Sequence, residues 1–96
     1  MNKHPLNDVY HAMADPTRRA VVERLARGPA SVSELADPHD IALPTFLRHL
    51  GVLETAGLVE STKKGRVRTC KLTPDALEPA RGWMTRQHRV WEARAE

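Results

Sequence analysis

Hydrophobic residues in the first third of the chain recur at helical spacing and predict two short helices. The first helix is expected over residues 6–13, where four apolar side chains at i, i+3, i+4 and i+7 share one face: Leu6, Val9, Tyr10 and Met13. Asp15-Pro16 is expected to begin the second helix, because aspartate caps a helix N-terminus and proline fits the first turn. Its buried face is formed by Val21, Val22 and Leu25, and Gly28-Pro29 ends it.

A short helix and a longer helix are predicted next. Ser31 or Ser33 can cap the short helix, which carries Val32 and Leu35 and is interrupted by Asp37-Pro38. Pro44 opens the longer helix, and Gly57 is expected to end it. Its apolar residues repeat at i, i+4 and i+7: Phe46, Leu50 and Leu53.

Two runs typical of β-strands follow, and then a last helix. Residues 58–63 and 66–72 are separated by Lys64-Gly65, which predicts a hairpin. Thr73-Pro74-Asp75 is expected to start the last helix, with Thr73 as its cap. This order of elements is that of a winged helix-turn-helix, a mainly α fold with a small β-hairpin wing. We expect one domain over 1–96, with a loose tail (1–5), a helix-turn-helix (31–57), a wing (58–72) and a dimerisation helix (74–96).

The net charge of +3 is concentrated in one third of the chain. Residues 41–72 hold six lysines and arginines against two glutamates, whereas the segments on either side are close to neutral. A localised basic surface is typical of proteins that bind a polyanion such as nucleic acid.

The same composition argues against several other classes of protein. Cys70 is the only cysteine, so no internal disulfide is possible, and this fits a reducing compartment. The five histidines are scattered and no glycine-rich phosphate loop is present, so we expect neither an enzyme nor a cofactor. The apolar runs are too short for a membrane span, and the N-terminus does not resemble a secretory signal. We therefore expect a cytoplasmic protein that does not bind membranes.

Several blocks of this sequence, in register, resemble the ArsR-type family of bacterial transcriptional repressors. They are ADPTRR at 14–19, SELA at 33–36, LPTFLRHLGVLETAGLV at 43–59 and the GRxxxxxL pattern at 65–72. The resemblance covers roughly residues 8 to 92. It implies a DNA-binding repressor that dimerises through its terminal helices.

The sequence also departs from the commonest pattern of that family. Ala42 and Leu47 stand where many members carry serine, and Gly51 stands where many carry a basic residue. The short helix before the turn has no cysteine pair, and the last helix lacks the Asp-x-His start of some zinc sensors. The resemblance therefore implies a non-metal branch, and the family's DNA contacts transfer only in part.

The helix after Pro44 is the predicted DNA-reading helix, because an α-helix fits the major groove. Arg48 is the candidate base reader, since its guanidinium can pair with guanine O6 and N7, and Thr45 can donate to a base or a phosphate. Leu47 either contacts a thymine methyl or covers the core. His49 either contacts a phosphate or packs against the preceding helix.

Cations of the wing are the predicted phosphate contacts: Lys63, Lys64, Arg66 and Arg68. Arg18 and Arg19 either add a backbone contact to DNA or pair with Glu23, and the pairing is favoured.

The first and last helices are the predicted dimer interface. Both tryptophans lie in the last helix, where little sequence remains to cover them. The expected contacts are Val9, Tyr10, Met13, Leu77, Trp83, Met84, Val90 and Trp91. A symmetric dimer would set two reading helices about 34–36 Å apart, on an inverted repeat.

Two other functions are alternatives to a DNA-binding repressor that needs no metal. His88 and Glu92 share a helical face, so a dimer can bring together four ligands for a metal-responsive repressor. A winged helix that binds a protein instead of DNA is the other alternative. The sequence names no effector and no operator.

Overall fold

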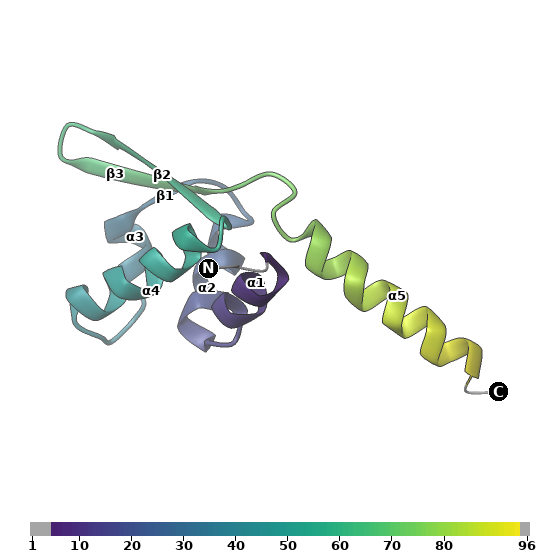
Figure 1. Cartoon of the computed structure of the whole chain (residues 1–96). Coiled ribbons are helices and arrows are strands. Elements are labelled where there is room, and N and C mark those ends of the chain that lie inside the picture. Colours follow the sequence, from purple (N-terminus) through teal and green to yellow (C-terminus); the bar gives the residue numbers. More distant parts are fainter. Residues whose placement is uncertain (1–4, 95–96) are drawn as a thin grey trace, which may run out of the picture.

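The computed structural model describes residues 5–94 and places five helices and three strands in them (Figure 1). The helices are α1 (Pro5–Met13), α2 (Pro16–Leu25), α3 (Val32–Ala36), α4 (Leu43–Thr55) and α5 (Glu78–Arg94). The strands are β1 (Ala30–Ser31), β2 (Val59–Lys64) and β3 (Val67–Leu72). This arrangement confirms the predicted mainly α fold with a β-hairpin wing.

The junction between α1 and α2 forms as the sequence predicts. The Asp15 carboxylate accepts a hydrogen bond from the backbone N–H of Arg18, and Pro16 is the first residue of α2. Residues 1–4 of the predicted tail lie outside the described residues. Pro5 already belongs to α1, so the tail ends at least one residue earlier than predicted.

Helices α3 and α4 form the helix-turn-helix. Ser31, and not Ser33, caps α3: its hydroxyl accepts from the Glu34 N–H, while the Glu34 carboxylate accepts from the Ser31 N–H. In α4 the side chains of Phe46, Leu50 and Leu53 are fully buried, as predicted. Gly57, at φ 76°, follows the end of α4, in a conformation that glycine adopts readily.

The wing is an antiparallel hairpin with a third, short strand beside it. The strand order is β1-β3-β2, and Lys64 pairs with Val67, so the two loop residues are Gly65 and Arg66. The predicted loop, Lys64-Gly65, was therefore wrong by one residue. The two-residue strand β1, which pairs Ala30 with Cys70, was not predicted.

The hydrophobic core lies where the helices meet the base of the sheet. Its largest fully buried side chains come from α4, α2 and the strand region: Phe46, Leu50, Leu53, Leu58, Val21 and Cys70. Cys70 is buried on β3, as its alternation with Leu72 predicts.

The last helix begins later than predicted. Residues 74–77 form turns, and Asp75 has a φ of 58°, which is outside the right-handed helical region, so α5 starts at Glu78. Residues 95–96 of the predicted helix lie outside the described residues.

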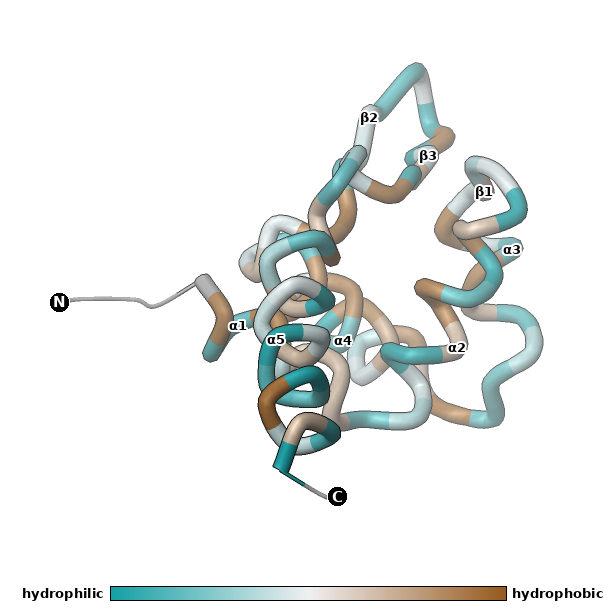
Figure 2. Tube along the Cα trace, turned by 90° about the vertical axis from the view of Figure 1, so that its right-hand side faces the viewer, coloured by the Kyte–Doolittle hydropathy of each residue, from teal (hydrophilic) through white to brown (hydrophobic). Residues whose placement is uncertain are grey.

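Helix α5 projects away from the rest of the chain (Figure 1). The molecule measures 56 × 30 × 23 Å with a radius of gyration of 15.6 Å. A compact chain of this length would have a radius of gyration of about 12–13 Å. Figure 2, which looks along α5 from its C-terminal end, shows hydrophobic residues interleaved with hydrophilic ones along this helix. None of the helices in the described part of the chain is long and apolar enough to cross a bilayer.

Candidate nucleic-acid interface

The outward side of α4 carries the side chains predicted to read DNA. Phe46, Leu50 and Leu53 point into the core, and the exposed side chains between them are those of Leu47 and Arg48. Arg48 is exposed, Leu47 is 38% exposed and Thr45 is half-buried. The structure thus leaves Arg48 and Leu47 accessible on one helix, with Thr45 beside them in its first turn.

The excess charge of residues 41–72 is carried by four exposed cations. Within the described residues, Arg68 pairs with Glu54 and Lys71 lies 3.8 Å from Glu60, so both acids of this segment are neutralised. The remaining cations of the segment form no salt bridge among residues 5–94: Arg48, Lys63, Lys64 and Arg66. One of them is on α4 and three surround the tip of the wing.

Arg68 is not a free cation, so its predicted contact with a phosphate is wrong for this residue. Its guanidinium donates to the Glu54 carboxylate of α4, and the Ser61 hydroxyl donates to the same carboxylate at 3.0 Å. Glu54 therefore links both strands of the wing to α4. The pair also offsets the repulsion between Arg68 and Lys63, which face each other across the hairpin.

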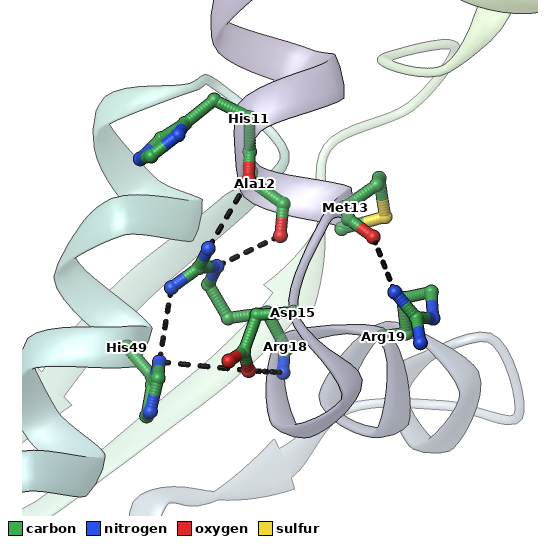
Figure 3. A network of polar contacts seen from close by, with 7 residues as sticks. All are labelled: His11, Ala12, Met13, Asp15, Arg18, Arg19 and His49. Carbon is green, nitrogen blue, oxygen red and sulfur yellow. Dashed lines mark hydrogen bonds and ion pairs between the residues drawn. The ribbon is translucent and has the colours of Figure 1, made fainter.

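His49 is held by the N-terminal region of α2 instead of being free to contact a phosphate (Figure 3). Its Nδ1 lies 3.0 Å from Nη1 of Arg18 and 3.7 Å from the Asp15 carboxylate. Of the two alternatives for His49, the structure supports packing, but the partner is α2 and not the preceding helix α3. Because a guanidinium only donates, Nδ1 of His49 is the acceptor in this hydrogen bond.

Arg18 and Arg19 bind the end of α1, so their predicted pairing with Glu23 was wrong. Arg18 donates from Nε to the Ala12 carbonyl at 2.8 Å and from Nη2 to the His11 carbonyl at 3.1 Å. Arg19 donates to the Met13 carbonyl at 2.8 Å, as Figure 3 also shows. Cations are favourable at a helix C-terminus, because they satisfy its last carbonyls and complement its dipole. Through Arg18 and His49, α1 and α2 hold α4 in place.

Asp15 stays ionised within this network. The Arg18 N–H donates to its carboxylate and lowers the pKa of Asp15, and the Arg18 guanidinium lowers it further against the opposing effect of burial. The cap of α2 therefore carries a negative charge, which is favourable at a helix N-terminus.

The predicted dimer surface is an uncovered apolar face. On α5 and just before it, five large hydrophobic side chains are 41–67% exposed: Leu77, Trp83, Met84, Val90 and Trp91. A groove of about 820 Å³ runs between α1 and α5, and its apolar wall includes Val9, Tyr10, Met13, Leu77, Ala80 and Met84. Val9 is itself 6% exposed, so it supports this wall but offers little area to a partner. Tyr10 fixes α5 to α1, because its hydroxyl donates to the Ala80 carbonyl at 3.0 Å and its ring packs edge-on against Trp83.

His88 and Glu92, the alternative metal-binding pair, contact each other on the exposed side of α5. His88 Nε2 lies 3.4 Å from the Glu92 carboxylate. Across residues 5–94, no group of three or more histidine, cysteine, aspartate or glutamate side chains is close enough to hold a metal ion.

The residues that hold α4 and the wing in position were not predicted from the sequence. Glu54 is one of only two acids in the basic segment, which was a usable signal for a buttress of the wing. The network of Arg18 depends on the close approach of α1 and α4, which no local pattern reveals. The exposed apolar residues Ile41, Leu43 and Val67 were also missed.

Comparisons with known proteins agree with this geometry. The sequence model of a protein family described as a helix-turn-helix domain matches residues 13–62, which run from the end of α1 into β2. The chain is 46% identical over 72 residues to an HTH-type transcriptional regulator of Mycobacterium tuberculosis, covering 75% of this chain and 67% of that protein. It is 29% identical over 79 residues to the transcriptional repressor SdpR of Bacillus subtilis, covering 82% and 88%.

A solved structure extends the likeness to almost the whole chain. The crystal structure of an ArsR family transcriptional regulator superposes with a TM-score of 0.88 at 48% sequence identity. The match covers 95% of this chain and all of that one, so it includes the wing and α5.

Proposed function

Because the chain belongs to the ArsR family of winged helix-turn-helix regulators, we propose that it is a sequence-specific DNA-binding repressor acting as a homodimer. The observation that carries this proposal is the cation set of α4 and the wing tip, which has no acidic partner in the described chain: Arg48, Lys63, Lys64 and Arg66. Unpaired cations that flank an exposed helix match a helix in the major groove between two phosphate strands.

The proposed contacts divide between α4 and the wing. Helix α4 enters the major groove, where Arg48 reads a guanine and Thr45 donates to a base edge or a phosphate. Lys63, Lys64 and Arg66 contact phosphates and contribute affinity without sequence preference. His49 and Arg68 are positioning residues, since each is occupied within the chain.

The homodimer is proposed from the exposed apolar face of α5. Trp91 is 67% exposed, and burying such a side chain against a partner contributes about 2–3 kcal/mol. A two-fold axis beside α1 and α5 would cover this face and place two reading helices about 34–36 Å apart. We therefore assign 31–57 to the helix-turn-helix, 58–72 to the wing and α5 to dimerisation, within one domain.

Repression follows if the dimer occupies a promoter and blocks polymerase access, in the bacterial cytoplasm where the DNA lies. The name of the Bacillus relative supports a repressor over an activator.

Selection of bound sequences from random duplexes, repeated at two salt concentrations, tests the proposal. We expect an inverted repeat with half-sites about one helical turn apart, and affinity that falls steeply with salt. Failure to enrich any sequence, together with affinity that ignores salt, would contradict DNA binding and favour a protein-binding winged helix.

A further inference from the structure

The exposed apolar side chains of the described chain fall into two groups. One group is the α5 surface already assigned to dimerisation. The other four large hydrophobic side chains lie on the helix-turn-helix and the wing, with exposed fractions between 38% and 55%: Ile41, Leu43, Leu47 and Val67. Nothing in the proposed dimer covers this second group.

Three members of the second group line one groove, and we call Leu43, Leu47 and Val67 the apolar strip. The groove holds about 760 Å³ between α3, α4 and the wing, and the apolar side chain of Val32 also lines it. Leu43 is the first residue of α4 and Leu47 lies one turn later, so two leucines stand in the N-terminal half of the reading helix.

Cations border the apolar strip. Lys63 and Arg66 line the same groove, and neither has an acidic partner among residues 5–94. The one carboxylate in the groove, Glu54, is neutralised by Arg68. The occupant that fits this groove is therefore apolar at its centre and anionic at its edges.

Thymine in the major groove has this combination. Its C5-methyl group is the apolar feature that a side chain can contact there, and the phosphates lie on either side. In a helix-turn-helix the N-terminal residues of the second helix reach the base edges. The place of Leu43 and Leu47 in α4 therefore favours DNA over an acidic, apolar segment of a protein.

We propose that the apolar strip recognises thymine methyl groups, so that each operator half-site carries thymines beneath the first two turns of α4. This inference rests on the proposed function and specifies the DNA it selects. Leu43 and Leu47 are four residues and hence about 6 Å apart along the helix. Since base pairs rise by about 3.4 Å, the two leucines face thymines about two steps apart.

Replacing thymine by deoxyuridine tests the proposal, because it removes only the methyl group. Each thymine of a selected operator is replaced in turn, and binding to the wild-type protein is measured by fluorescence anisotropy. At about 0.8 kcal/mol per buried methyl group, we expect about fourfold weaker binding at each contacted thymine. In Leu47→Ala or Leu43→Ala the effect of the corresponding replacement should disappear.

Lys64→Ala is the matched control. Lys64 lies at the wing tip but does not line the groove, so this variant should weaken every duplex and leave the deoxyuridine effects unchanged. Deoxyuridine replacements that are all silent, or a selected half-site without thymine, would overturn the thymine inference while DNA binding stands. A wild-type protein that binds no duplex would overturn both proposals. The deoxyuridine series needs no variant, so it stays decisive if an alanine variant fails to fold.

Discussion

Arg18→Ala should destabilise the protein well beyond an ordinary surface substitution. The Arg18 side chain makes three hydrogen bonds of 2.8 to 3.1 Å, to the carbonyls of Ala12 and His11 and to Nδ1 of His49. Alanine removes all three, but it keeps the backbone N–H that donates to Asp15, so the cap of α2 survives. The loss therefore falls on the packing of α1 and α4 against α2.

The expected loss is about 2–3 kcal/mol in the free energy of unfolding. Hydrogen bonds of charged groups contribute about 1.5–3 kcal/mol each. The three hydrogen bonds of Arg18 together contribute less than the sum of such values, because the site is only partly buried and water can replace the donor at the His11 carbonyl. Arg19→Ala is the matched control, since the neighbouring side chain makes one exposed bond, to the Met13 carbonyl. It should cost about 0.5–1 kcal/mol.

Urea unfolding followed by far-UV circular dichroism measures both variants. Protein concentration must be the same in each experiment, because dimerisation makes stability depend on concentration. The free energy of unfolding falls by about 1–3 kcal/mol per molar urea, so the urea concentrations at which the two variants are half unfolded should differ by roughly 1 M. Equal midpoints for Arg18→Ala and Arg19→Ala would refute the reasoning, because the network would then contribute no more than one exposed bond.

Three further predictions concern the cap of α2, the α5 surface and the wing. The pKa of Asp15 is lowered in the folded state, so its stabilisation is complete above its ordinary value of 3.8 and is lost as pH falls through the lower folded value. The stability difference between wild type and Asp15→Ala, about 1 kcal/mol at pH 7, should therefore shrink between pH 5 and pH 2; a constant difference would contradict this. Met84→Asp should weaken dimerisation at least about 100-fold in sedimentation experiments, whereas Arg86→Asp, on the opposite face of α5, should not, and equal effects would argue against the α5 interface. Gly65→Ala should cost about 1 kcal/mol in thermal unfolding, because alanine is strained at a φ of 64° although the space around it is open; an unchanged melting temperature would contradict this.

Local signals in the sequence were sufficient for most of the fold. The apolar spacing of Phe46, Leu50 and Leu53 defines α4, and Asp15-Pro16 and Gly57 mark boundaries because their backbone chemistry is local. Strand β1 was missed because two residues carry no periodicity, and their pairing with β3 is a long-range contact. The late start of α5 depends on the left-handed conformation of Asp75, which a cap-like Thr73-Pro74-Asp75 pattern does not reveal.

The candidate site was less accessible to sequence reasoning than the fold. Charge counts locate the basic segment, but they do not tell a free cation from a paired one. Arg68 and Lys63 are equivalent in the sequence, and only the approach of Glu54 from α4 separates an anchored guanidinium from an exposed ammonium. The role of His49 depends in the same way on Arg18, which is 31 residues away in the chain.

Binding of Arg48→Ala and Lys64→Ala to the selected operator and to a scrambled duplex, over a range of salt concentrations, tests the central claim most directly. If α4 reads the major groove while the wing grips the backbone, Arg48→Ala should cost about 1–3 kcal/mol on the operator alone. Lys64→Ala should weaken binding to both duplexes alike, and it should reduce the slope of log affinity against log salt concentration by about one. Unchanged operator affinity in both variants would contradict the account.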